Sequence, residues 1–176
     1  MSKLSPDEQW LYFGSGSRTD HGEFEGALRE VPLSATIFRL PTSGQDIVLQ
    51  NDEAALEPYV FAKGFRNPFD LGVNAEGELF ATDNGPDMDL PEEINWVREG
   101  MHYGFPWRFG VEDNPVLDPT YDATGDQRLH QGYQAYDRKN YVHDPEFPVA
   151  PAEPFVDAIV NRGPDGRGCL ARTSAM

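Results

Sequence analysis

Two short stretches of the chain contain residue types suited to binding an anion and a cation. The first is GFRNP, residues 64–68, in which Arg66 carries a planar, permanently charged guanidinium group that matches carboxylates. Because a residue before proline is held in an extended conformation, Asn67 is kept out of a helix. A stiff loop of this kind can present Arg66 to an anionic ligand. The alternative is a surface arginine that caps a turn or pairs with a nearby acid.

The second stretch is TDNGPDMDLPEEIN, residues 82–95, which is rich in oxygen donors. Calcium takes 6 to 8 oxygen ligands, including backbone carbonyls, so this density is typical of calcium sites. The stretch is not an EF-hand, because a template that starts at Asp83 places Gly85 where an acid is required. Pro86 has no N–H, so a turn here leaves the carbonyls of Gly85 and Pro86 available to a metal. A solvated acidic loop is the alternative.

The histidines and the cysteine do not form a recognisable site. His21 follows Asp20, a pair that resembles a base and its orienting acid, but it lies in a Gly-flanked polar loop with no nucleophile nearby. The other histidines lack metal-ligand spacing, and the single Cys169 excludes an internal disulfide. We therefore assign these residues no chemical role. The remaining histidines are His102, His130 and His143.

Short apolar runs separated by turn residues must position the two stretches. The 17 glycines and 15 prolines are spread along the chain, which suits many short strands better than long helices. NAEG, residues 74–77, predicts a tight turn. This pattern favours an all-β sandwich, barrel or propeller. The predicted strands are 10–17, 35–40, 46–50, 58–64, 69–73, 79–82 and 93–97, with 35–40 and 46–50 forming a hairpin.

Composition excludes several classes of partner. The formal net charge is −16, and a negative surface repels both nucleic acid and anionic lipid headgroups. No apolar run reaches the length of a membrane span, and the first residues do not form a signal peptide. Beyond residue 106 the strand pattern fades among prolines and tyrosines, and the last residues show no periodicity.

Residues 64–107 resemble the soluble pyrroloquinoline-quinone (PQQ)-dependent glucose/sorbosone dehydrogenase family. The shared motifs are Gly-x-Arg-Asn-Pro, a hairpin, Gly-Pro, Glu-Ile-Asn and Tyr-Gly-x-Pro, with Phe105 in place of the usual tryptophan. The resemblance implies a six-bladed β-propeller. At ~40–45 residues per blade, the chain supplies about three to four blades, so we expect an all-β, incomplete six-bladed β-propeller with long irregular loops. Residues 1–106 would hold the blades with the cofactor and calcium loops, 107–165 a loop-rich continuation, and 166–176 an irregular tail.

The resemblance also implies roles for single residues. Arg66 and Asn67 would touch PQQ, with Arg66 as the catalytic residue, and Asn84 would line the same site. The backbone carbonyls of Gly85 and Pro86 would hold the calcium ion that activates the quinone. Such an arrangement would supply the positive charge that a strongly acidic protein needs to bind a cofactor with several carboxylates.

A second, structural calcium ion is implied at Glu93 and Tyr103, with Asp113 as a third ligand. The implied reaction is oxidation of a sugar hydroxyl by hydride transfer to PQQ, followed by transfer to an electron acceptor. In the family the general-base histidine precedes the strand that matches residues 10–16. We therefore expect a fragment, truncated at both ends and inactive alone, from a periplasmic or extracellular enzyme.

Two other functions fit the same residues. One is a calcium-dependent propeller lactonase, in which the metal alone polarises an ester. The other is a non-catalytic propeller fragment that serves as a binding surface, because a fold does not fix a function.

Overall fold

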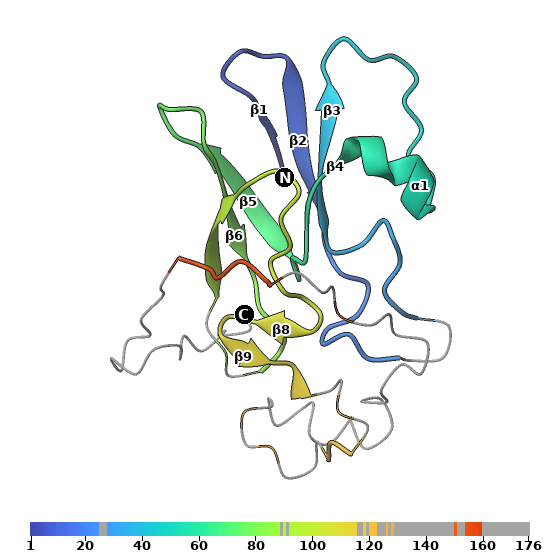
Figure 1. The fold of residues 1–176 in the computed structure, drawn as a ribbon, viewed down its shortest axis with the longest axis vertical. Coiled ribbons are helices and arrows are strands. Elements are labelled where there is room, and N and C mark those ends of the chain that lie inside the picture. Colours follow the sequence, from blue (N-terminus) through green and yellow to red (C-terminus); the bar gives the residue numbers. More distant parts are fainter. Residues whose placement is uncertain are drawn as a thin grey trace.

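The computed structural model describes residues 1–24, 28–88, 90, 92–115, 118, 120–122, 126, 128, 150 and 154–159. Across these residues the fold consists of three antiparallel sheets, one short α-helix and one 3₁₀ helix (Figure 1). The all-β class is confirmed. The predicted tail 166–176, much of the stretch 107–165, and His130, His143 and Cys169 lie outside the described residues.

The first sheet is a four-stranded antiparallel meander in the order β1-β2-β3-β4. In its centre, β2 and β3 pair along their whole length, from Trp10 opposite Pro41 to Ser15 opposite Thr36. The edge strand β1 was not predicted, because its three residues are exposed and carry no apolar alternation. The strands are β1 (Ser2–Leu4), β2 (Trp10–Ser15), β3 (Thr36–Pro41) and β4 (Val60–Lys63).

The second sheet contains β5 (Pro68–Val73), β6 (Leu79–Asp83) and β7 (Glu93–Val97), paired in that order. The predicted turn between β5 and β6 is confirmed. The Oδ1 atom of Asn74 accepts the backbone N–H groups of Glu76 at 3.1 Å and Glu78 at 2.8 Å, and Gly77 adopts φ +88°. Where the chain reverses, these bonds take the place of the backbone hydrogen bonds between the strands. The turn therefore fixes the register of β5 on β6.

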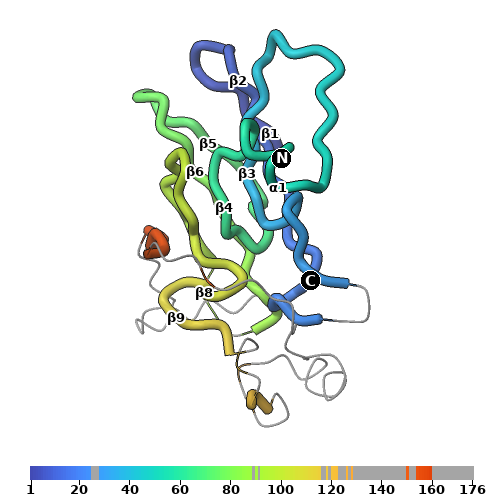
Figure 2. Tube along the Cα trace, turned by 45° about the vertical axis from the view of Figure 1, so that its right-hand side comes forward, coloured from blue at the N-terminus to red at the C-terminus, as the bar shows by residue number. Residues whose placement is uncertain are grey.

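The two larger sheets pack against each other through their alternating buried residues. In β7, Glu93, Asn95 and Val97 are buried while Ile94 and Trp96 are exposed, as expected for a strand with one face in the core. Figure 2 shows the two sheets side by side. The shared core contains Ile37, Phe61, Ala62, Phe65, Leu71, Leu79, Ala81, Val97 and Tyr103.

The predicted hairpin between residues 35–40 and 46–50 is wrong. Residues 46–50 form no strand, and Val48 is 76% exposed. Both edges of β3 are already occupied by β2 and β4, so a further strand has no place to pair. The chain instead continues into α1 (Glu53–Leu56) and the 3₁₀ helix η1 (Glu57–Tyr59). The side chain of Asp52 caps α1 by accepting the N–H of Ala55 at 3.0 Å.

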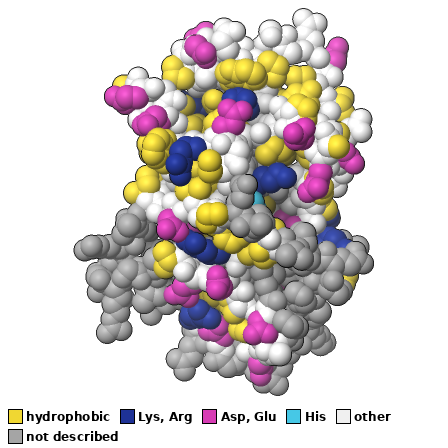
Figure 3. Space-filling model, in the orientation of Figure 1, with side chains coloured by type: hydrophobic (Ala, Val, Ile, Leu, Met, Phe, Trp, Pro, Cys, Tyr) yellow, Lys and Arg dark blue, Asp and Glu magenta, His cyan; other side chains and the backbone are white. Residues whose placement is uncertain are grey.

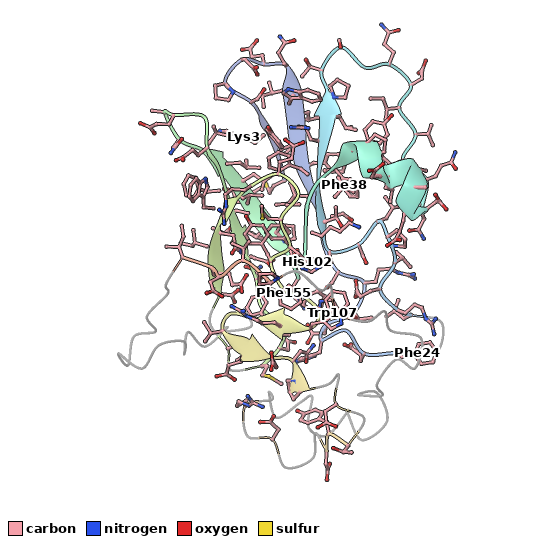
Figure 4. The ribbon with its side chains drawn as sticks, viewed as in Figure 1. Lys3, Phe24, Phe38, His102, Trp107 and Phe155 are labelled. Carbon is pink, nitrogen blue, oxygen red and sulfur yellow. The ribbon has the colours of Figure 1, made fainter. Side chains whose placement is uncertain are left out.

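Below the two sheets, short pieces of chain converge around one histidine. The ring of His102 lies 5.4 Å from that of Trp107 and 5.1 Å from that of Phe155, measured between centroids (Figure 4). The segment 154–159 is further tied down by Val156, whose N–H bonds the carbonyl of His102 at 2.9 Å. This cluster anchors the last described segment to the sheets. Two short strands, β8 (Arg108–Phe109) and β9 (Glu112–Asp113), lie nearby.

The surface agrees with the acidic composition. On the face drawn in Figure 3, acidic side chains are scattered over the sheets and do not gather in one patch, and basic side chains lie among them. Within the described part of the chain, no helix has the length and apolar character needed to cross a bilayer.

Candidate functional site

The two stretches singled out in the sequence lie side by side in the structure. The pairing of β5 with β6 places Pro68 opposite Asp83, so the residues before 68 and after 83 emerge at the same end of the hairpin. There the N–H of Asn84 donates to the carbonyl of Asn67 at 3.1 Å. The register of one hairpin therefore brings Arg66 and Asn67 next to the loop that contains Gly85 and Pro86.

Asp83 holds the Arg-Asn-Pro loop in place. Its carboxylate accepts the backbone N–H of Arg66 at 2.9 Å and that of Asn67 at 2.6 Å, and the side chain is fully buried. Burial and the nearby charge of Glu93 raise the pKa of Asp83 well above its ordinary value. Asp83 lies 17 positions after Arg66 and 16 after Asn67, and it satisfies both of their buried N–H donors.

The glycine that opens the GFRNP motif is required by close packing. Gly64 has φ +88°, and a Cβ atom there would lie 2.4 Å from Nδ1 of His102 and 2.6 Å from the backbone nitrogen of Gly104. A side chain would collide with both neighbours and strain the backbone. Because Gly64 has no side chain, the backbone can pass close to His102 just before it enters the loop that contains Arg66.

A third segment, residues 16–20, forms another wall of the site. The N–H of Ser17 donates to the carbonyl of Arg66 at 2.6 Å. On the other side, the carboxylate of Glu30 accepts the N–H groups of Arg18 at 3.1 Å and Thr19 at 2.8 Å. The backbone N–H groups of this segment are therefore bound on one side by a carbonyl and on the other by a side-chain carboxylate.

Asp20 joins three parts of this site. Its carboxylate forms an ion pair with the guanidinium of Arg66, accepts the N–H of Asp87 at 2.9 Å, and lies 2.7 Å from Nδ1 of His21. The Asp20 side chain is 13% exposed and that of His21 is fully buried. Burial acts to raise the pKa of Asp20, but the hydrogen bond to His21 and the charge of Arg66 outweigh it and leave the pKa lowered. Asp20 is therefore a carboxylate held between a guanidinium group and an imidazole ring.

An open hollow of about 350 Å³ lies between these segments. Its volume is within the ~300–1,000 Å³ range of small-molecule sites. The Nε atom of Arg66 is buried and has no hydrogen-bond partner, so one guanidinium donor is left unsatisfied next to this site. The charged guanidinium of Arg66, which lines the hollow, suits an oxygen-rich anionic ligand. The hollow is lined by Ser17, Arg18, Thr19, Asp20, Arg66 and Asn67.

The loop after β6 is held tightly around Gly85. The N–H of Gly85 donates to the carboxylate of Glu92 at 2.6 Å, and a Cβ atom on Gly85 would lie 2.8 Å from the ring of Phe109. The carbonyl of Pro86 accepts the N–H of Met88 at 2.6 Å. The Pro86 carbonyl, expected to be free for a metal, is thus already engaged by Met88, and only its second lone pair can bind calcium.

Glu93, Tyr103 and Asp113, the residues assigned to a second calcium ion, have three different environments. Glu93 is buried and accepts the N–H of Gly110 at 2.5 Å, and burial raises its pKa. The Tyr103 hydroxyl donates to the carbonyl of Trp96 at 2.5 Å, and Asp113 is exposed on β9. Across the described residues, no three His, Cys, Asp or Glu side chains are grouped as a metal site. The second calcium site stays a prediction.

Sequence reasoning missed the acids that organise the site. Asp20, Glu30 and Asp83 each bind backbone or guanidinium groups far away in the chain. Asp83 directly follows the predicted strand 79–82 and was noted only as one oxygen donor of the stretch 82–95, with no indication that it holds the Arg66 loop. Asp20 was noted as a neighbour of His21, but its contact with Arg66 joins residues 46 positions apart and leaves no local pattern.

Comparison with known proteins gives a family match over most of the chain. The sequence model of the Glucose / Sorbosone dehydrogenase family matches residues 2–137. None of the curated proteins compared with the chain matches it.

Several solved structures are also similar. The aldose sugar dehydrogenase of Streptomyces coelicolor, in its PQQ-bound form, is 24% identical, with a TM-score of 0.43 over 73% of this chain and 32% of that one. A putative glucose dehydrogenase from Thermus thermophilus is 26% identical, with a TM-score of 0.44 over 65% and 34%. The soluble aldose sugar dehydrogenase of Escherichia coli, in the apo form, is 22% identical, with a TM-score of 0.41 over 60% and 30%. The chain spans about a third of the length of these structures.

Proposed function

The chain belongs to the glucose/sorbosone dehydrogenase family, and from that premise we propose that it forms the cofactor-binding part of a quinoprotein that oxidises a sugar hydroxyl. The proposed cofactors are PQQ and calcium, and the reaction is hydride transfer from the sugar carbon to the quinone. We further propose that the complete protein is a six-bladed β-propeller that passes electrons to a separate acceptor in the periplasm or outside the cell.

One observation supports this proposal above the others. The permanently charged guanidinium of Arg66 lines a polar hollow beside Asn67, next to the loop that contains Asn84. A planar cation of this kind fits the carboxylate and carbonyl oxygens of PQQ. The surrounding protein is strongly acidic, so an anionic ligand needs a local cation of this kind to bind.

The residues of the chain would bind and orient the cofactor. The chemistry supplied by bound PQQ is hydride acceptance, made easier by a calcium ion that polarises the quinone. Arg66 would donate to a quinone oxygen and stabilise the negative charge that grows there, which is the catalytic role we assign to it. Asn67 and Asn84 would donate side-chain N–H groups at the edge of the ring.

We propose two calcium ions. The first would be held by the carbonyls of Gly85 and Pro86, next to the quinone. The second would be held by Glu93, with Tyr103 and Asp113 as further ligands. A buried oxygen supports the second ion: Oδ1 of Asn95 has no hydrogen-bond partner, while Nδ2 of the same residue donates to Glu93 at 2.9 Å. An unsatisfied amide oxygen beside a buried carboxylate suits a cation.

Titration with PQQ tests the proposed function directly. The full chain is mixed with increasing PQQ in the presence of calcium, and binding is followed by quenching of tryptophan fluorescence and by the absorbance of the quinone. We expect saturable binding with one PQQ per chain, which weakens strongly when calcium is chelated with EGTA. Arg66→Ala should raise the dissociation constant strongly, to a value that is still measurable at high PQQ concentration, whereas Arg39→Ala, which removes an arginine paired with Glu99, should leave it unchanged.

Two results would overturn the proposal. If the wild-type chain does not bind PQQ, then PQQ is not its cofactor. Hydrolysis of a sugar lactone by the calcium-loaded chain without quinone would instead identify a metal-dependent hydrolase.

A further inference from the structure

Asp20 has an unusual set of contacts for an acid at an anion site. A carboxylate next to a hollow that is to receive an anion repels that ligand, so by charge alone Asp20 weakens binding. Yet the same carboxylate contacts Arg66, the backbone of Asp87 and His21, which come from three different segments. Its side chain is only 13% exposed, so these contacts occupy most of its surface.

Among the described residues, the only ion pair of the Arg66 guanidinium is the one with Asp20. Its backbone is fixed by Asp83 and Ser17, but the Nε–H has no partner, and the side chain forms its ion pair with Asp20. Without this partner the guanidinium end of the side chain would be less ordered, and ordering it would cost conformational entropy when a ligand binds. The pair with Asp20 removes that freedom in advance.

We propose that Asp20 is a positioning residue that acts through Arg66 and holds its guanidinium toward the hollow for the anionic cofactor. The inference rests on the proposed function, because it names the ligand that Arg66 receives. His21 supports the carboxylate from the buried side, and the bond to the Asp87 N–H ties the same carboxylate to the loop of Gly85 and Pro86. Asp20 thus links Arg66 to the loop that contains the carbonyls of Gly85 and Pro86.

The direction in which Asp20→Asn changes PQQ affinity separates a positioning role from a simple charge effect. Asp20→Asn removes a negative charge beside an anion site, so a charge effect alone makes PQQ bind more tightly. Positioning predicts the opposite, with a dissociation constant raised by about tenfold or more, because the charge-assisted bond that orders Arg66 is lost. Glu76→Gln removes the same charge from an exposed turn and should leave the dissociation constant unchanged.

A double-mutant cycle tests whether Asp20 acts through Arg66. The dissociation constant of PQQ is measured, with calcium present, for Asp20→Asn in the wild-type background and in Arg66→Ala. We expect Asp20→Asn to weaken PQQ binding in the wild-type background. In the Arg66→Ala background the same substitution should change the dissociation constant by less than about twofold. Equal losses in both backgrounds, or equal or tighter binding by Asp20→Asn alone, would overturn the inference.

Asp20→Glu gives a second variant if Asp20→Asn does not fold. It keeps the charge and moves it by one methylene group, so PQQ should bind less tightly than to the wild type while the melting temperature is retained. Binding equal to that of the wild type would show that the position of the carboxylate is unimportant, which contradicts positioning.

A ligand-free measurement keeps this inference separate from the proposed function. The side-chain Nε–H signal of Arg66, assigned by its disappearance in Arg66→Lys, reports the mobility of the guanidinium by ¹⁵N relaxation. It should be rigid in the wild type and mobile in Asp20→Asn. If the wild type binds no PQQ but shows this difference, the proposed function fails and the positioning stands; if Arg66 is equally rigid in both, the positioning fails.

Discussion

Asn84 donates its backbone N–H to the carbonyl of Asn67 at 3.1 Å, and this bond joins the loop after β6 to the loop before β5. The contact follows from the β5–β6 register, which ends with Pro68 opposite Asp83. A guanidinium group and a carbonyl-rich loop therefore share one end of one hairpin. How that end is built, and what it binds, can be tested by substitution and by calcium binding.

Asp83→Asn should destabilise the protein by about 1–3 kcal/mol, because an amide offers one acceptor oxygen and would turn an NH₂ group toward the second backbone donor. The two donors are the N–H groups of Arg66 and Asn67. Urea unfolding followed by tryptophan fluorescence measures the loss. Asp70→Asn is the control, since Asp70 is exposed on the neighbouring strand. Equal stability of the two variants would show that Asp83 does not support the loop.

Gly64→Ala should destabilise by roughly 3 kcal/mol or more, because the new Cβ atom adds backbone strain and a collision. The collision is with His102, 2.4 Å from the Cβ position. Gly72→Ala is the matched control on β5, where a Cβ atom would meet nothing within 4 Å. Thermal unfolding of both variants provides the comparison. A melting temperature for Gly64→Ala as high as that of Gly72→Ala would contradict the packing described here.

Tyr103→Phe should cost about 1–3 kcal/mol, because the carbonyl of Trp96 and the N–H of Arg98 lose their shared partner. The ring would keep its stacking on Phe65, 4.8 Å away between centroids. Measuring the unfolding free energy in EGTA isolates the hydrogen bonds from any bound calcium. An unchanged value in EGTA would contradict a stabilising role for these two hydrogen bonds.

Calcium should raise the melting temperature of the chain in the absence of quinone, since a ligand that binds only the folded state adds about 2.7 kcal/mol at a hundred times its dissociation constant. Glu93→Gln should remove most of this response, because it removes the buried charge that we assign to the second ion. Glu99→Gln, an exposed charge-matched control, should retain it. A full calcium response in Glu93→Gln would exclude Glu93 as a ligand.

The sequence predicted the part of the site that depends on local pattern. The turn at Asn74 and Gly77 and the alternation in residues 93–97 fix the second sheet, and the hairpin then brings Arg66 near Gly85. It failed for residues 46–50, where apolar residues suggested a strand although β3 had no free edge. It also could not identify Asp20 as the partner of Arg66, because any of 30 acids satisfies the same charge and only the fold selects one.

A crystal structure of the chain with PQQ and calcium tests the central claim most directly. We predict the quinone at the hollow beside Arg66 and Asn67, with a calcium ion bound to the carbonyls of Gly85 and Pro86. A quinone bound elsewhere, or a calcium ion distant from residues 85–86 while PQQ occupies the hollow, would contradict the account.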